Sequence, residues 1–158
     1  MHTKMNQIYP LPTPMTDHQI LEKASEIIAA KFLGSDPFTA AKATKEYLTF
    51  KLANYDKEVF AVMLLNTQHQ LIEYRELFFG TVDSASIYPR DVVKAVLEVN
   101  ASAVIFAHNH PSGSAEPSEA DKRITKRLSD ALGLIDVRVL DHVVVGREPV
   151  SFAERGLI

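Results

Sequence analysis

The segment AVIFAHNHPSGSAEPSEAD, residues 103–121, carries the strongest structural signal in the sequence. Its first five residues are apolar, and a short apolar run of this kind is typical of a buried strand. Pro111 and Gly113 favour a turn of the chain in the polar stretch that follows. Ser118 can then cap a helix that begins directly after it. The segment therefore predicts a strand, a loop and a helix in succession, the repeating unit of an α/β fold.

The rest of the chain after about residue 58 continues this alternation. The pattern predicts strands over 59–65, 71–79, 102–107, 135–140 and 143–145, and helices over 89–100 and 118–132. On the first of these helices we expect four residues to face inward, Val92, Val93, Val96 and Leu97. The fold class that follows is α/β, with a sheet flanked by helices.

The first 55 residues have a different texture. Residues 1–15 contain three prolines at alternating positions, which predicts an extended or disordered arm. Residues 16–55 predict a helical appendage of two helices. Thr16 or Asp17 can cap the first helix, and Thr39 can cap the second.

The composition excludes several classes of protein. A chain of 158 residues with 46% hydrophobic and 23% charged residues is expected to be globular. It contains no cysteine, which excludes disulfides, cysteine-ligated zinc, iron–sulfur clusters and thiol catalysis. The formal net charge of −3 argues against a general nucleic-acid coat protein. Neither a membrane span nor an apolar signal core is present, so we expect a cytoplasmic protein without a membrane partner.

Three side chains around the central loop have the character of a metal site. His108 and His110 occupy alternate positions of an extended segment, so their side chains point to the same face. Asp121, in the first turn of the next helix, can complete the set. Two imidazoles and one carboxylate suit zinc, and three protein ligands leave a fourth position for water, as in catalytic sites. Two plainer interpretations remain: a surface histidine pair, and a capping box formed by Ser118 and Asp121.

Two further polar groups have two interpretations each. Asp141 and His142 interrupt an apolar stretch, and they either orient a metal ligand or form a structural hydrogen-bonded pair. One face of the helix over 118–132 carries four basic residues, Lys122, Arg123, Lys126 and Arg127. This face either meets nucleic acid or an acidic protein segment, or it is simply solvated.

The central segment resembles a known motif. His108, His110, Pro111, Ser118 and Asp121 match the JAMM motif of MPN+ metalloproteases at every defined position. A wider resemblance, over about residues 55–158, is to the RadC family. It rests on Gly80-Thr81, Pro89-Arg90-Asp91, the segment 108–113, Pro117-Ser118, Asp121, Asp141-His142 and Gly146.

The resemblance implies a JAMM/MPN-like, cytidine deaminase-like mixed sheet flanked by helices, with residues 56–158 as the catalytic-type domain. RadC proteins typically carry a helix-hairpin-helix segment ahead of this domain, and no clear one is visible here. That departure weakens an inference to DNA binding. The resemblance points to bacteria.

The resemblance also implies roles for individual residues. His108, His110 and Asp121 would bind one zinc ion per chain, and Ser118 would hydrogen-bond the tetrahedral intermediate.

The general acid/base of the family is a glutamate next to the strand that opens the domain. In this chain that position corresponds to Glu58. From the residues alone, Glu73, Glu116 and Glu119 are rivals, because the last two lie close to the ligands in sequence.

These expectations define the function to be tested. The first hypothesis is a zinc-dependent JAMM-type metallopeptidase that hydrolyses amide or isopeptide bonds of a peptide or protein substrate. The alternatives are an accessory protein of DNA repair or recombination, which would bind nucleic acid, and a non-catalytic MPN interaction scaffold. An exposed edge of the sheet would permit a homodimer.

Overall fold

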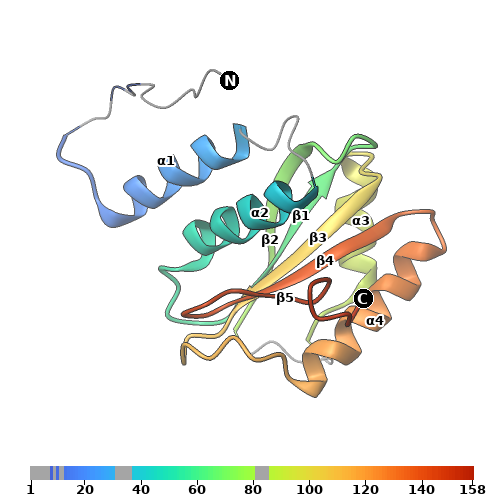
Figure 1. The fold of residues 1–158 in the computed structure, drawn as a ribbon. Coiled ribbons are helices and arrows are strands. Elements are labelled where there is room, and N and C mark those ends of the chain that lie inside the picture. The colour runs from blue at the N-terminus through green and yellow to red at the C-terminus, as the bar shows by residue number, and fades with distance from the viewer. Residues whose placement is uncertain (1–7, 9, 11–12, 31–36, 81–85) are drawn as a thin grey trace.

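A five-stranded mixed sheet forms the centre of the computed structural model, which describes residues 8, 10, 13–30, 37–80 and 86–158 (Figure 1). The strands are β1 (Val59–Leu65), β2 (Leu71–Phe79), β3 (Ala103–Asn109), β4 (Arg138–Val145) and β5 (Val150–Ser151). Their order in the sheet is β2-β1-β3-β4-β5. Strands β3 and β4 run parallel, and the other neighbouring pairs are antiparallel.

Helices cover both faces of the sheet. They are α1 (Asp17–Ala30), α2 (Pro37–Leu52), α3 (Pro89–Glu98) and α4 (Glu119–Gly133). Helices α3 and α4 lie on one face and α2 on the other, with α1 packed beside α2 (Figure 1). This arrangement confirms the predicted α/β fold of the JAMM/MPN type. No helix among the described residues is long and apolar enough to cross a membrane.

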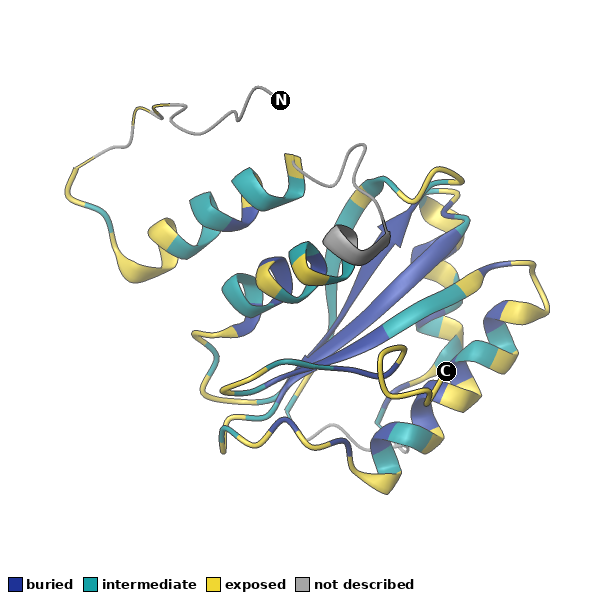
Figure 2. Cartoon of the chain, in the orientation of Figure 1, coloured by how far each residue is buried: buried dark blue, intermediate teal, exposed yellow. Residues whose placement is uncertain are grey.

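The central strands β1 and β3 are buried along their whole length (Figure 2). Strand β1 is apolar throughout and β3 is apolar over its first five residues, as expected for strands that are covered on both faces. In the register of this antiparallel pair, Phe60 lies opposite His108. The start of β1 and the carboxyl end of β3 therefore meet at one edge of the sheet, where the polar residues of β3 are found.

The two N-terminal helices begin in different ways. Thr16 caps α1, because its hydroxyl accepts the N–H of Gln19 at 3.2 Å. Helix α2 begins at Pro37, two residues before the predicted cap at Thr39. Proline is favoured in the first helical turn, where the N–H that it lacks has no partner within the helix.

The predicted divisions of the chain are only partly within the described residues. The predicted arm over residues 1–15 lies largely outside them. Helix α2 contacts the sheet directly, with Tyr47, Leu48 and Leu52 buried against β1 and β3. A boundary at residue 56 stays a prediction.

Two details of the predicted elements are wrong. Leu97 is 60% exposed, and Ala95 is buried in its place, because the buried stripe of α3 follows the spacing of Val92, Ala95 and Val96. The two strand pieces predicted over 135–140 and 143–145 are one strand, β4. The polar pair Asp141-His142 interrupts the apolar pattern of the sequence, but the strand continues through it.

Candidate metal centre

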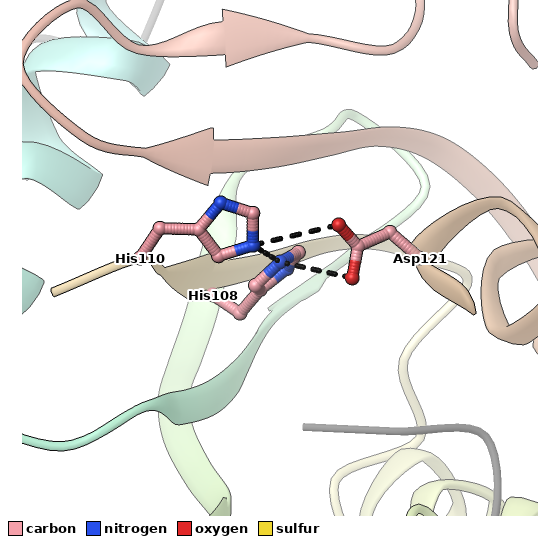
Figure 3. Close-up of side chains that lie close together, drawn as sticks. All are labelled: His108, His110 and Asp121. Atoms are coloured by element: carbon pink, nitrogen blue, oxygen red, sulfur yellow. Dashed lines mark hydrogen bonds and ion pairs between the residues drawn. The ribbon is translucent and has the colours of Figure 1, made fainter. Parts of the chain in front are cut away.

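Three potential metal ligands converge at the carboxyl end of β3 (Figure 3). His108 is the penultimate residue of β3, His110 follows the strand, and Asp121 lies in the first turn of α4. The two Nε2 atoms are 3.0 Å apart. His108 Nε2 lies 3.3 Å from Asp121 Oδ1, and His110 Nε2 lies 3.5 Å from Asp121 Oδ2. Ligands of a tetrahedral zinc with bonds of about 2.0 Å are about 3.3 Å apart, so this donor set fits zinc.

A capping box holds the carboxylate in place. The Ser118 hydroxyl accepts the N–H of Asp121 at 3.0 Å, and Asp121 Oδ2 accepts the N–H of Ser118 at 2.8 Å. The capping interpretation of this pair is therefore confirmed, and the same carboxylate also faces the two imidazoles. Asp121 is fixed by its own helix start before any ligand arrives.

Charge at the site is arranged around Asp121. Burial raises the pKa of this carboxyl, but hydrogen bonds from His108 and His110 outweigh burial and hold it well below its usual range. The hydrogen bond to Asp121 in turn raises the pKa of His110, against the effect of desolvation. Asp121 is therefore an anionic side chain across the physiological pH range.

The orientation of His110 follows from its second ring nitrogen. Nδ1 lies 2.7 Å from the backbone oxygen of Ser114. A carbonyl oxygen can only accept a hydrogen bond, so Nδ1 carries a proton. In the neutral ring the lone pair is then on Nε2, which faces His108 and Asp121.

His142 lies directly behind His108. Its Nε2 is 2.8 Å from His108 Nδ1, and its Nδ1 is 2.6 Å from the hydroxyl of Thr125. Burial lowers the pKa of His142 well below its usual value, which keeps the ring neutral. Of the two interpretations of the Asp141-His142 pair, the orienting one fits the contacts of His142. Thr125 was missed, since a threonine one turn after Asp121 on a helix carries no distinctive signal.

Asp141 has the structural role. Its carboxylate accepts hydrogen bonds from the Ser151 hydroxyl at 2.6 Å and from the N–H groups of His142 and Ala153 at 2.7 and 2.9 Å. Burial raises its pKa. The residue ties β4 to β5 and to the turn that follows.

Glu58 lies at the start of β1, in a segment held by Asn109. Asn109 is 4% exposed; its Oδ1 accepts the N–H of Val59 at 2.7 Å, and its Nδ2 donates to the Lys57 oxygen at 3.0 Å. The charge of Glu58 contributes to the raised pKa of His110, which places the carboxylate within electrostatic reach of the centre. Sequence reasoning missed Asn109, although its position between two histidines of an extended segment directs its side chain to the opposite face.

The rival glutamates have other partners. Each forms an ion pair: Glu73 with Arg75, Glu116 with Arg155, and Glu119 with Lys122. Glu73 also lies opposite Leu64, toward the far end of β1 from the histidines. Glu58 is the candidate whose charge acts on His110.

The basic face of α4 is partly neutralised by its own helix. Lys122 pairs with Glu119 at 3.0 Å and Lys126 with Asp130 at 2.9 Å. Exposed pairs of this kind are typical of a solvated helix surface. A nucleic-acid partner stays a prediction.

Comparison with known sequences identifies the family of this chain. The RadC-like JAB domain family matches residues 38–157. A UPF0758 protein of Vibrio cholerae serotype O1 is 59% identical over 148 residues, 94% of either chain, and a second from the same organism is 62% identical over 140 residues, 89% of either chain. A UPF0758 protein of Idiomarina loihiensis is 53% identical over 140 residues, which cover 88% of this chain and 62% of that relative. The predicted RadC resemblance is confirmed, and the chain belongs to the RadC-like JAB domain family.

Proposed function

We propose that the protein is a zinc-dependent hydrolase of amide or isopeptide bonds, of the JAMM metallopeptidase type. The observation that carries the proposal is the convergence of His108, His110 and Asp121 within ligand distance of one another. Three protein ligands are typical of a catalytic rather than a structural zinc site, because they leave one position open.

The three ligand side chains determine what chemistry a bound zinc ion would supply. Zinc held by two neutral imidazoles and one carboxylate would keep a net positive charge, polarise a carbonyl group and lower the pKa of a water molecule to about 7. Asp121 keeps its negative charge because its pKa lies far below neutrality. His110 must lose its proton to become a ligand, and its raised pKa makes this step pH-dependent.

Glu58 would act as the general base and acid. It would take a proton from the attacking water and later pass this proton to the leaving amine. The hydrogen bonds of Asn109 to Val59 and Lys57 hold the backbone on both sides of Glu58. Proton transfer of this kind contributes roughly 10²–10⁴-fold to the rate.

Ser118 would stabilise the oxyanion of the reaction. Its hydroxyl oxygen accepts the N–H of Asp121, which leaves the hydroxyl proton free to be donated toward a substrate. Ser118 is exposed, so a substrate can reach it. Loss of one such donor typically costs about 10²–10³ in kcat.

A hydrolysis assay on zinc-loaded protein tests the proposal. The probe is a library of fluorogenic peptides together with isopeptides linked through a lysine side chain. We expect hydrolysis by the wild type, and a loss of roughly 10²–10⁴-fold in Glu58→Gln at unchanged zinc content. Glu116→Gln is the matched control, because Glu116 pairs with Arg155 at the surface and should leave the rate unchanged. Undiminished hydrolysis by Glu58→Gln would contradict the proposal, and zinc-loaded wild type without any hydrolysis would favour a non-catalytic scaffold.

A further inference from the structure

The two histidines of the metal centre differ in what accepts their second ring N–H. His110 donates to the backbone oxygen of Ser114, which can only accept. His108 instead faces another imidazole, His142. An imidazole nitrogen donates or accepts according to the tautomer, so this contact alone leaves the proton of His108 unassigned.

Thr125 resolves the direction of the whole chain of hydrogen bonds. Its hydroxyl donates to the backbone oxygen of Asp121 at 2.7 Å, and this uses its only proton. The Thr125 oxygen must then accept from His142 Nδ1, which is 2.6 Å away. With its proton on Nδ1, neutral His142 has a lone pair on Nε2. That lone pair accepts the Nδ1–H of His108, so Nε2, which faces Asp121, is the nitrogen of His108 that can bind a metal once it no longer donates to the carboxylate.

Water has no access to this network. His108 and His142 are fully buried, and Thr125 is 3% exposed. Aromatic rings enclose His142: Phe152 stacks on it with 4.7 Å between ring centroids, and Phe60 meets it edge-on at 5.7 Å. A lost partner therefore cannot be replaced by solvent, so each residue depends on its neighbour.

The network closes on itself through Asp121. Its backbone oxygen accepts from Thr125, while its carboxylate lies 3.3 Å from the ring of His108. The circuit joins α4 to β4 and β3, the three elements on which Thr125, His142 and His108 lie. It fixes two of the three proposed ligands relative to each other.

We propose that Thr125 and His142 are positioning residues that hold His108 in the tautomer whose Nε2 lone pair faces the metal position. The inference rests on the proposed function and deepens it, because it names what sets the metal affinity of the site. Groups that hydrogen-bond metal-ligating histidines typically change metal affinity by 10–100-fold when they are removed.

Nitrogen NMR of the metal-free protein, with ¹⁵N-labelled histidine, tests the tautomers without any metal. In the wild type we expect the protons of His142 and His108 on Nδ1. Thr125→Val removes the acceptor at nearly constant shape, so the proton of His142 should move to Nε2, and Nδ1 of His108 should become the acceptor. Thr125→Ser keeps the hydroxyl and should keep the wild-type tautomers.

Zinc affinity, measured by competition with a chromophoric chelator, gives the second readout. Thr125→Val should bind zinc about 10–100-fold more weakly than the wild type, and Thr125→Ser should match the wild type. Either a wild-type His142 protonated on Nε2 or full zinc affinity in Thr125→Val would overturn the inference. If the wild type shows the expected tautomers and binds no zinc, the network is supported and the proposed function is contradicted.

Discussion

Helices α1 and α4 begin with the same local device in very different surroundings. At α1, the Thr16 hydroxyl accepts from Gln19, and the Gln19 side chain accepts the N–H of Thr16 at 2.9 Å. At α4, Ser118 and Asp121 form the same reciprocal pair. Both are capping boxes, in which two otherwise unpaired N–H groups of the helix start are satisfied.

The difference lies in what the fold places opposite the third residue of the helix. Gln19 is exposed. The side chain of Asp121 is 3% exposed, and it faces His108 and His110 from β3 and the loop that follows. A local pattern therefore predicts a helix start in both cases. Only the tertiary structure brings the third residue of one helix, Asp121, next to two histidines and makes it a candidate ligand. Four predictions test this contrast.

The largest expected effect is on metal binding by Asp121→Asn. Asparagine can still accept the N–H of Ser118, but it removes the negative charge between the two imidazoles, so zinc binding should be lost. Isothermal titration with zinc measures this effect. Gln19→Ala, the matched change at α1, should bind zinc as the wild type does. Equal zinc affinity in Asp121→Asn and the wild type would remove Asp121 from the ligand set.

Ser118→Ala should distinguish the role of Ser118 as a helix cap from its proposed role in hydrolysis. The lost cap should lower the free energy of unfolding by about 1 kcal/mol. The lost hydroxyl donor should lower the rate of hydrolysis by about 10²–10³. Steady-state kinetics and urea unfolding measure the two effects on one preparation. If the rate of hydrolysis falls only as far as the folded fraction of the protein does, Ser118 acts as a helix cap and has no role in hydrolysis.

Acid should destabilise the two helix starts differently. The pKa of Asp121 is depressed in the folded protein, whereas an aspartate in the unfolded chain has a pKa of about 3.9. As the pH falls, the carboxylate is therefore protonated in the unfolded chain before it is protonated in the folded protein. The stabilisation is therefore present above about pH 4 and is lost as the pH falls toward the lower folded pKa. Urea unfolding of metal-free protein between pH 3 and pH 6 should show a steeper loss in the wild type than in Asp121→Asn. Gln19→Ala should keep the wild-type slope, and parallel curves for Asp121→Asn and wild type would contradict the assignment.

The smallest effect is expected for Thr16→Ala. It should lower stability by about 1 kcal/mol through the lost cap of α1. Zinc affinity and the rate of hydrolysis should both stay at the wild-type values, because Thr16 is exposed and begins α1, which packs beside α2. Thermal unfolding together with a zinc titration measures this. A loss of zinc affinity would show that α1 is coupled to the metal centre.

Local patterns in the sequence predicted most of the elements and the three side chains that converge at the candidate centre. The apolar run of β1, the alternation of His108 and His110, and the capping pair of α4 each depend on neighbours within a few residues. Because such patterns depend on local geometry, they could predict the strand, the loop and the helix, and also that His108 and His110 point to the same face.

Contacts between distant segments could not be predicted in the same way. Asn109 holds the backbone around Glu58, about fifty residues earlier, and Thr125 reaches His142 across two elements. The polar residues of β4 looked like an interruption because their partners come from elsewhere in the chain. The apolar character of Leu97 predicts a core position, but it does not show which side of the helix the sheet covers, and Leu97 is exposed.

Metal content shows whether His108, His110 and Asp121 hold zinc. The wild type and His108→Ala, purified without an affinity tag or chelator and exposed to zinc before removal of the excess, would be compared by inductively coupled plasma mass spectrometry. We expect one zinc per wild-type chain and none in His108→Ala. A wild type that retains no metal, or a variant that retains as much as the wild type, would contradict it.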